Sequence, residues 1–345
     1  MADTRTTSED GSTRAANIFD VARLAGVSHQ TVSRVINDLP NVRPATRARV
    51  EQAIAQLRYS PSPAARALVT RRTRTIGLVT PGISDYGPTS VALNFNYAAR
   101  ESRYSVDTVS APPDDPKAWR SAIEGLLRQR VDAIVLVVVH VAVLELVRSL
   151  DLSIPVVACA STARRSPLIV SIDQYRGARA AVRHLAELGH TRILHLAGPA
   201  TAPDAIERAR GWSDELAAHR LELTEPAYGD WSAASGHRLA SAWDVGPGTA
   251  IFVANDQMAI GVLSALRERG LRVPEDVSVV GFDDIPEAGY LYPPLTTVRQ
   301  DFAALGELMM QKVLLAAEEP DTTTEATPIP THLIVRHSTA APEAP

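Results

Sequence analysis

The chain has 345 residues, of which 45% are hydrophobic and 21% charged, with a net charge of −4. This length predicts two or three domains, and this composition is typical of globular proteins rather than of disordered or fibrous ones. The longest apolar run, AIVLVVVHVAVLELV, is too short for a membrane span and the polar N-terminus does not resemble a signal peptide, so we expect a cytoplasmic protein without a membrane partner.

The charge is unevenly distributed along the chain. Residues 17–74 contain ten arginines and three acidic residues, a net charge of +7, so the rest of the chain carries −11. A basic segment joined to an acidic remainder is typical of a nucleic-acid-binding domain attached to a domain with another role. The single cysteine, Cys159, lies in the apolar run PVVACA and is expected to be a buried thiol.

The N-terminal region predicts a tail followed by two short helices. Residues 1–16 are polar and predict a disordered tail. Residues 17–37 predict two helices joined by a turn, because Asn17 and Asp20 have the spacing of a capping box and Gly26 permits the left-handed conformation that ends a helix. The residues expected on the apolar face of the first helix are Val21, Ala22 and Leu24.

The second helix has few apolar positions and many polar ones. Ser28 is expected to cap it, with Val32 and Val35 facing inward. Hydrogen-bonding side chains in the first turns of a second helix are typical of a helix that reads the DNA major groove. Gln30 can pair with adenine and Arg34 with guanine, although both could instead form an ordinary solvated helix face. The side chains expected outside are His29, Gln30, Thr31, Ser33 and Arg34.

A third helix and a short connecting segment follow. Pro44 suits a first helical position, and the apolar spacing predicts a helix over residues 44–57, completing a headpiece over residues 17–61. Residues 62–73 contain AARALV, which could form two helical turns. Helices this short are marginal in water, so we expect this segment to fold only on DNA, the alternative being an arginine-rich linker.

From residue 74 the sequence alternates between strand-like and helical segments. Buried strands separated by helices predict parallel sheets covered on both faces, with a ligand cleft at the carboxyl ends of the strands. There are too many strands for one sheet. The predicted fold is therefore a small all-α helix-turn-helix headpiece plus an α/β core of two doubly wound parallel-sheet subdomains. The expected strands are TIGLVT, SVDTV, DAIVLVV, PVVACA, RILHLAG, AIFVAN and VSVVGF.

The segment NIFDVARLAGVSHQTVSRVIN resembles the helix-turn-helix of the lactose/galactose repressor family, in which DVA, AGVS and TVSRV-N recur at this spacing. The resemblance covers the whole chain and implies a periplasmic-binding-protein-like core of type I over residues 74–338. It places lobe 1 at about 74–172 and 300–330 and lobe 2 at about 173–299 and 331–338, with chain crossings near 172, 299 and 331. Residues 339–345 are expected to form a flexible tail.

The resemblance also implies which residues contact DNA. His29, Gln30 and Arg34 occupy the main base-reading positions of the family, and Leu68 matches the leucine that opens a base step in the minor groove. Ser62 departs from the usual Asn of the hinge. The remaining expected DNA contacts are Ile18, Phe19, Ser28, Thr31, Ser33, Asn37, Tyr59, Ala65 and Arg66.

The expected ligand site combines polar groups with aromatic rings, as sugar sites do. Arg208 matches the family's clamping arginine, and Trp231 and Phe282 are candidate stacking rings. Asn255 with Asp256 could instead be a helix cap, and Trp212 is expected in the core. The other expected contacts are Ser84, Asp85, Tyr86, Asn255, Asp283 and Gln300. The motifs GDWSA-SG and VANDQMA-G are similar to the lactose branch rather than the purine-sensing branch, but Ala160 replaces an aspartate there.

These features predict a transcriptional repressor that binds a pseudo-palindromic double-stranded operator as a homodimer and responds to a mono- or disaccharide. A purine or other corepressor and a non-DNA sugar-binding protein stay open as alternatives. Helices near 88–102 and the segment after 301 are expected at the dimer interface, and the Pro-rich C-terminus lacks the heptads of a coiled coil. No cofactor or metal is expected, because His184, His190 and His195 lack metal-like spacing, and no enzyme motif is present.

Overall fold

The computed structural model describes residues 16–36, 39–59, 72–162, 169–318 and 325–342. The chain divides into two compact units, residues 1–73 and 74–345, which are taken separately below. The predicted N-terminal tail and hinge segment lie almost entirely outside the described residues. The predicted DNA contacts that also lie outside them are Asn37, Ala65, Arg66 and Leu68.

The first unit is a three-helix headpiece whose helix ends follow the expected chemistry. Helices α1 (Ile18–Ala25) and α2 (His29–Ile36) are joined by Gly26, which has a φ of 63°. The Asn17 side chain accepts hydrogen bonds from the backbone N–H groups of Phe19 and Asp20, and the Asp20 carboxylate accepts from the N–H of Asn17. The predicted capping box and left-handed end are therefore confirmed.

The headpiece core is small. Helix α3 (Pro44–Gln56) packs across both shorter helices. The prediction that Leu24 faces the core is wrong, because its side chain is 46% exposed. The apolar face of α1 instead passes through the small Ala22 and Ala25, which let the helices approach closely. The buried residues of this core are Val21, Ala22, Ala25, Val32, Val35, Val50 and Ala53.

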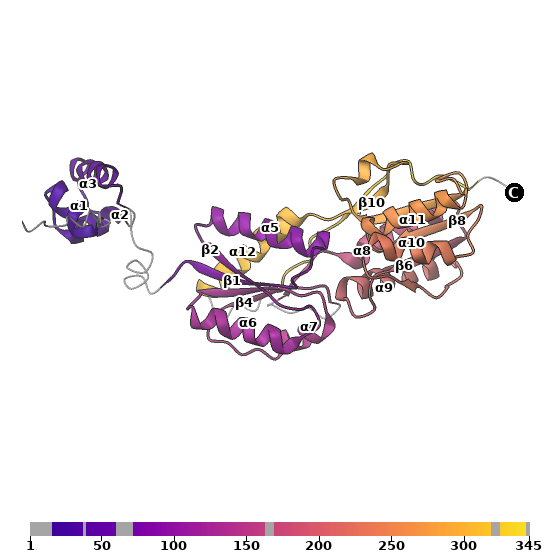
Figure 1. The fold of residues 1–345 in the computed structure, drawn as a ribbon, viewed down its shortest axis with the longest axis horizontal. Coiled ribbons are helices and arrows are strands. Elements are labelled where there is room, and N and C mark those ends of the chain that lie inside the picture. The colour runs from indigo at the N-terminus through magenta and orange to yellow at the C-terminus, as the bar shows by residue number, and fades with distance from the viewer. Residues whose placement is uncertain (1–15, 37–38, 60–71, 163–168, 319–324, 343–345) are drawn as a thin grey trace, which may run out of the picture. The chain divides into compact units, whose positions relative to one another are not determined.

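The second unit begins with lobe 1, a five-stranded sheet in the order β2-β1-β3-β4-β5, with every pair parallel. Helices α5 and α12 cover one face and α6 and α7 the other (Figure 1). The strands are β1 (Thr75–Thr80), β2 (Ser105–Ser110), β3 (Ala133–Val137), β4 (Val156–Cys159) and β5 (Ile169–Val170). The helices are α5 (Tyr86–Glu101), α6 (Pro116–Arg128), α7 (Val141–Arg148) and α12 (Phe302–Glu318).

Lobe 2 is a six-stranded sheet in the order β11-β10-β9-β8-β6-β7. Helices α8 and α9 cover one face and α10 and α11 the other (Figure 1). The strands are β6 (Arg192–Ala197), β7 (Ala227–Tyr228), β8 (Thr249–Val253), β9 (Val277–Asp283), β10 (Thr296–Arg299) and β11 (His332–Ile334). The helices are α8 (Gln174–Glu187), α9 (Pro203–Ala218), α10 (Ala233–Ala242) and α11 (Asp256–Glu268), with a 3-10 turn, η1, at Ala288–Tyr290.

All seven predicted strands are present, and the predicted pair of parallel sheets is confirmed. The sequence prediction missed β5, β7, β10 and β11, because these strands are two to four residues long and lack a long apolar run. Strand β11 pairs antiparallel with β10 and closes one edge of lobe 2. The core is thus mostly, but not entirely, parallel.

Three chain connections join the lobes: β5 to α8, β10 to α12, and α12 to β11. The first and third run side by side, because Ile172 and Ile329 form a parallel bridge. The N–H of Asp173 donates to the carbonyl of Ile329 at 2.8 Å. The predicted crossings near 172, 299 and 331 fall in or beside these connections.

More of the C-terminal segment is bound to lobe 2 than the sequence predicted. The N–H of Ala340 donates to the hydroxyl of Ser278 at 3.1 Å, and the ring of His190 lies 3.0 Å from the Ala340 carbonyl oxygen. Thr339 contacts the ring of His184 at 2.9 Å. The prediction of a flexible tail from residue 339 is therefore wrong for Thr339 and Ala340. Polar contacts of this kind leave no apolar pattern in the sequence.

Within the described ranges, none of the helices is both long enough and apolar enough to cross a membrane.

Candidate functional site

The first candidate surface is the outer face of α2 in the headpiece. His29, Gln30 and Arg34 are exposed, as predicted, while Val32 and Val35 are buried. Ser28 accepts a hydrogen bond from the N–H of Thr31 at 3.2 Å, so it caps the helix. Two buried valines therefore fix the rotation of α2, and this rotation presents its polar side chains together on one face.

Residues from outside α2 extend this surface. The Phe19 ring is 58% exposed and its centroid lies 5.2 Å from that of the His29 ring. Ile18 and Tyr59 are half-buried and pack against the headpiece core, while Thr31 and Ser33 are half-buried on α2. The structure thus places Phe19 beside His29, and Ile18 and Tyr59 at the edge of the headpiece core.

The second candidate site is a cavity of about 260 Å³ between the two lobes. It lies where the carboxyl ends of several strands meet the first turns of the following helices, the position expected for ligands of doubly wound folds. The predicted ligand residues that line it are Asp85, Tyr86, Arg208, Trp231, Asn255 and Asp283. The other lining residues are Ile83, Gly87, Pro88, Pro113, Val139, His140, Pro199, Thr201, Ala202 and Asp204.

Three predicted ligand residues do not line this cavity: Ser84, Phe282 and Gln300. The Phe282 ring is fully buried, and the guanidinium carbon of Arg208 lies 3.9 Å from its centroid. The expectation that Phe282 stacks on a ligand is corrected accordingly, because Arg208 covers this ring. Gln300 lines a second, smaller cavity of about 40 Å³.

Arg208 is the central cation of the cavity. Its side chain projects from α9 and its Nη2 lies 3.5 Å from a carboxylate oxygen of Asp283. Its Nε donates to the amide oxygen of Gln174 at 2.9 Å, and its Nη1 donates to the carbonyl of Ala254. Since a guanidinium has five N–H donors, two are left over from these three contacts. Arg208 is thus held in place before any ligand arrives.

Asp283 ends strand β9 and is almost fully buried. Burial raises its pKa to about 7, although the Arg208 charge opposes this shift. Its φ of 114° lies in the left-handed region, which is unusual for a residue other than glycine. Strained backbone of this kind is concentrated at binding sites, where the surrounding fold holds it.

Trp231 forms an aromatic wall of the cavity, and Gly198 makes room for it. A Cβ atom at Gly198, just after β6, would lie 2.2 Å from the Trp231 ring. The Asn255 amide nitrogen donates to the Trp231 carbonyl at 3.0 Å, while its oxygen accepts from the N–H of Met258 at 3.0 Å. Asn255 is therefore the cap of α11 and a support of Trp231, although it also lines the cavity.

Lobe 1 contributes Asp85 and Tyr86 at the start of α5. Asp85 occupies the capping position of this helix, yet its side chain makes no capping hydrogen bond. Burial raises the pKa of Asp85, and the charge of Asp230 from lobe 2 adds to the shift. The Tyr86 ring packs edge-on against Phe302, with centroids 5.8 Å apart. An acidic side chain and an aromatic ring thus face the cavity from this lobe.

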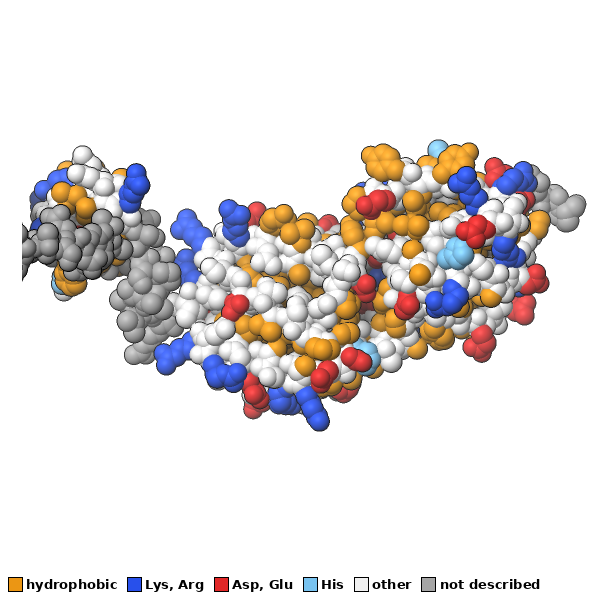
Figure 2. Space-filling view, viewed as in Figure 1, with side chains coloured by type: hydrophobic (Ala, Val, Ile, Leu, Met, Phe, Trp, Pro, Cys, Tyr) orange, Lys and Arg blue, Asp and Glu red, His pale blue; other side chains and the backbone are white. Residues whose placement is uncertain are grey.

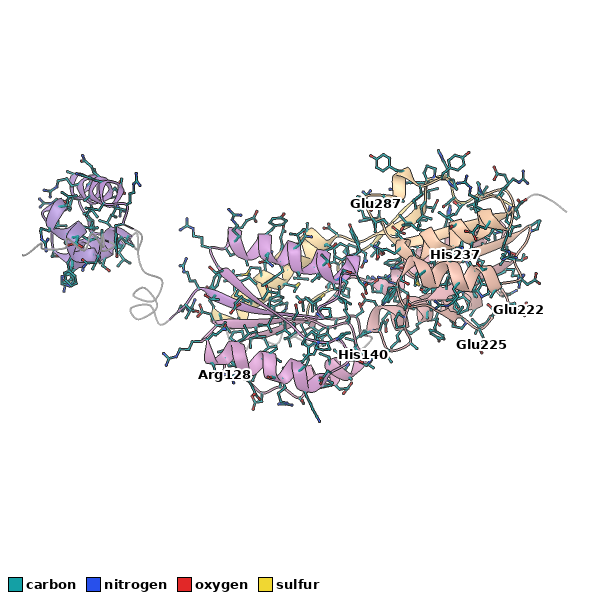
Figure 3. The ribbon with its side chains drawn as sticks, viewed as in Figure 1. Arg128, His140, Glu222, Glu225, His237 and Glu287 are labelled. Carbon is teal, nitrogen blue, oxygen red and sulfur yellow. The ribbon has the colours of Figure 1, made fainter. Side chains whose placement is uncertain are left out.

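Three polar lining residues were missed by the sequence prediction: His140, Thr201 and Asp204. His140 caps α7, and Figure 3 shows it at the end of lobe 1 that adjoins lobe 2. It directly follows the apolar run that contains β3. Its position at the carboxyl end of a strand could therefore have indicated a ligand-site residue. Asp204 lies one helical turn before Arg208, with 4.0 Å between its carboxylate and Nη2. This i,i+4 spacing could also have indicated it.

The smaller cavity adjoins the larger one, since both linings include Gly87, Pro88, Val139 and Asp204. Its lining also contains Ala160, Gln174 and Gln300. Ala160, which stands where an aspartate was expected from the family resemblance, therefore contributes only a methyl group here. Asp256 lies away from both linings and is fully buried, and Asn255 alone caps α11.

Carboxyl groups outnumber cations in the lining of the larger cavity. Asp85, Asp204 and Asp283 supply three carboxyl groups, and Arg208 is the permanent cation of this lining. Figure 2 shows acidic side chains at the surface beside the junction of the lobes. Such a site suits a ligand that donates hydrogen bonds and carries no negative charge. In the part of the chain that the structure describes, no group of three acidic, His or Cys residues is placed to hold a metal ion.

Two protein-family models match the chain. Residues 17–62 match bacterial regulatory proteins of the lacI family, and residues 182–339 match the periplasmic binding protein-like domain.

Curated relatives match along nearly the whole chain. The lactose operon repressor of Escherichia coli K12 is 33% identical over 342 residues, covering 95% of this chain and 92% of that protein. The HTH-type transcriptional regulator CelR of Thermobifida fusca is 36% identical over 339 residues, covering 92% and 96%.

Solved structures agree with these relatives. The lac repressor dimer bound to operator and the anti-inducer ONPF has a TM-score of 0.84 and 32% identity, covering 95% of this chain and 100% of that chain. The complex of the regulator CelR with cellobiose has a TM-score of 0.68 and 30% identity, covering 94% and 99%. The similarity extends over the headpiece and both lobes.

Proposed function

The chain belongs to the lacI family of bacterial regulatory proteins, and we propose that it is a repressor whose affinity for operator DNA is controlled by a sugar in the interlobe cavity. The observation that carries this proposal is the combination of two features in one chain. One is a capped second helix with an exposed polar face, and the other is a preformed cavity with a fixed arginine, carboxylates and an aromatic wall. The regulator acts in the cytoplasm, where its DNA target is.

The headpiece supplies sequence recognition. Gln30 and Arg34 make bidentate contacts with base edges in the major groove, and His29 reads a base or a phosphate. Ile18, Phe19, Ser28, Thr31, Ser33 and Tyr59 position the headpiece on the DNA backbone. Asn37 and the hinge residues Ala65, Arg66 and Leu68 act in the same complex, with Leu68 entering the minor groove. A net charge of +7 over residues 17–74 favours association with the phosphate backbone.

The effector is an uncharged mono- or disaccharide. Sugar hydroxyl groups donate to the carboxylates of Asp85 and Asp204 and accept from Arg208, while the Trp231 ring packs against an apolar sugar face. A phosphate ester or sugar acid would bring its negative charge close to the carboxyl groups of Asp85 and Asp204. Arg208 does not offset this repulsion, because its charge is already shared with Asp283.

A homodimer completes the operator-binding unit. The related lac repressor structure is a dimer bound to operator, and two headpieces match a pseudo-palindromic site. In this chain Leu93 and Tyr97 lie one turn apart on α5 and are 50% and 56% exposed. Figure 2 shows hydrophobic side chains at the surface over this helix. We place the dimer interface on α5 and the neighbouring α12.

Repression and its release follow from two lobe arrangements. In one, the lobes hold two hinge segments close enough to fold together on DNA. A sugar that binds the other arrangement more tightly shifts the population and lowers operator affinity, by no more than its difference in affinity for the two. No catalytic step is part of this function.

A ligand screen with the full-length protein tests the effector. Thermal unfolding is followed with uncharged mono- and disaccharides, including lactose and cellobiose, and with purines. A sugar at 100 times its Kd should stabilise the protein by about 2.7 kcal/mol. Selection of DNA from a random pool then identifies the operator, and the sugar should weaken this binding. Stabilisation by a purine alone, or equal binding of all duplexes, would contradict the proposed function.

A further inference from the structure

Four buried side chains form a closed ring beside the cavity: Arg208, Gln174, Gln300 and Asp283. Arg208 Nε donates to Gln174 Oε1 at 2.9 Å, and Gln174 Nε2 donates to Gln300 Oε1 at 2.8 Å. Gln300 Nε2 then donates to Asp283 Oδ1 at 2.6 Å, and Arg208 Nη2 lies 3.5 Å from the same oxygen. The four residues are 3–7% exposed, so water does not compete with these contacts.

The direction of the hydrogen bonds in this ring is fixed by Arg208. A guanidinium only donates, so the Gln174 oxygen must face Arg208 and its amide nitrogen must face Gln300. Because the Gln174 nitrogen donates to the Gln300 oxygen, the Gln300 nitrogen must face Asp283. The orientations of both glutamine amides therefore follow from donor and acceptor chemistry alone.

The ring contains residues from two of the three connections between the lobes. Gln174 begins α8 just after the first connection, and Gln300 lies between β10 and α12 in the second. Since the first connection is already bridged to the third at Ile172 and Ile329, the contact between the two glutamines links all three. Rotation of one lobe against the other must change backbone angles at these connections.

The ring also lies between the two cavities. Arg208 and Asp283 line the larger cavity, while Gln174 and Gln300 line the smaller one. A ligand that takes a hydrogen bond from Arg208 or gives one to Asp283 therefore acts on the same ring that joins the connections.

We propose that this ring is the latch that holds the lobes in the arrangement seen here, and that Gln174 is a positioning residue that acts through Arg208 and Gln300. The role of the larger cavity as the effector site rests on the proposed function. The latch itself does not, so its test needs neither an effector nor an operator.

Interlobe distances measured by electron spin resonance test this latch. Spin labels are placed at Arg128 on α6 and Ala217 on α9, both exposed, in full-length protein carrying Cys159→Ala. A second pair, Ala217 and Arg267, lies within lobe 2 and reports whether that lobe stays folded. Labelled chains are diluted with unlabelled chains, so that only distances within one chain are measured.

Gln174→Met keeps the length of the side chain but removes both of its hydrogen bonds. Each buried hydrogen bond lost should change the ratio of other lobe arrangements to the latched one by roughly fivefold. The interlobe distribution should therefore broaden or gain a second population, while the distance within lobe 2 stays unchanged. Gln129→Met, at an exposed position at the end of α6, is the matched control and should have no effect.

Substitutions that reverse the orientation of the Gln300 amide distinguish the latch from a general packing role of Gln174. At pH 9, where Asp283 is ionised, Gln174→Glu still accepts from Arg208, but either orientation of Gln300 now places two acceptors face to face, so the latch should open. Adding Asp283→Asn supplies a donor for the reversed Gln300. In that arrangement Gln300 donates to Glu at 174 and accepts from Asn at 283, while Arg208 keeps its contact with residue 174.

The double variant should therefore recover the narrow interlobe distribution that Gln174→Glu loses. A packing role for Gln174 predicts no such rescue. The proposal is overturned if the interlobe distribution of the double variant is as broad as that of Gln174→Glu. It is also overturned if Gln174→Met leaves this distribution unchanged. If Gln174→Met disturbs the distance within lobe 2, the comparison of Gln174→Glu with its double variant distinguishes the latch from a packing role. Absence of sugar binding would contradict the proposed function and leave this result standing.

Discussion

The Thr297 hydroxyl donates a hydrogen bond of 2.6 Å to the carboxylate of Asp256, and both residues are fully buried in lobe 2. The same carboxylate also accepts from the N–H of Ile285 at 3.0 Å. These two contacts join α11 to β10 and to the loop after β9. Burial nevertheless raises the pKa of Asp256 to about 8, and the neighbouring charge of Asp283 adds to the shift.

The stability of lobe 2 should therefore fall as the pH rises. An aspartate whose pKa is raised from 3.8 to about 8 keeps its proton in the folded state over a range in which the unfolded chain has lost it. The free energy of unfolding then decreases with pH between these two values. Burial also lowers the pKa of His195 to about 4, which has the opposite effect, but only below its ordinary value of 6.5.

Above pH 6.5 Asp256 and Asp283 determine how the free energy of unfolding changes with pH. We expect the urea midpoint to fall between pH 6.5 and 9, with a loss of about 2 kcal/mol from Asp256. Asp283, whose pKa is raised to about 7, adds to this loss at the lower end of the range. Asp256→Asn keeps the size of the side chain and should reduce the slope. A midpoint that is constant or rises over this range would show that Asp256 is ionised in the folded protein.

Gly198→Ala should weaken sugar binding without unfolding lobe 2. A Cβ at this position would lie 2.2 Å from the Trp231 ring, so the ring must leave its place in the cavity wall. Loss of one well-placed aromatic contact should weaken binding of a stacking sugar by roughly tenfold. Calorimetry with the sugar found in the screen measures this.

Gly246→Ala is the matched control for that substitution, because a Cβ atom at Gly246 would have no neighbouring atom within 4 Å. It should bind the sugar like the unmodified protein. If both variants bind equally well, Trp231 does not form part of the sugar site.

Arg34→Ala should relax sequence recognition at one base pair of the operator. The expected loss is about 1–3 kcal/mol with the preferred base and little with the others, because a bidentate contact with guanine is removed. The measurement is binding to a set of operators with single base changes at fixed salt. Arg49→Ala, exposed on α3, is the control and should not alter the preference at any base pair. A uniform loss with Arg34→Ala would assign this residue to a phosphate.

Leu93→Asp should dissociate the homodimer. A charge in the centre of an apolar interface removes packing and is left without a partner, which typically costs about 2 kcal/mol or more, roughly a thirtyfold rise in the dissociation constant. Sedimentation velocity over a concentration series measures this. Leu223→Asp is the control, since Leu223 is similarly exposed but lies in lobe 2, away from α5. A dimer equally stable in both variants would place the interface elsewhere.

The local features of this protein are predictable from its sequence. The Asn17–Asp20 capping box and the left-handed Gly26 follow from neighbouring residues alone, and so does the inward rotation of α2 by Val32 and Val35. The seven long apolar strands and the double parallel sheet were likewise predictable, because buried parallel strands require continuous apolar runs. Where one interaction joins residues a few positions apart, its signal is present in the sequence.

Which polar groups share a site becomes known only from the packing of the chain. Phe282 belongs to the core because Arg208 covers its ring, and Leu24 is exposed because small alanines bring α1 close to its neighbours. Gln174 meets Gln300 across 126 positions, a contact that no local pattern predicts. A buried hydrogen bond depends on where two backbones meet after packing, so its partners become known only when the lobes are assembled.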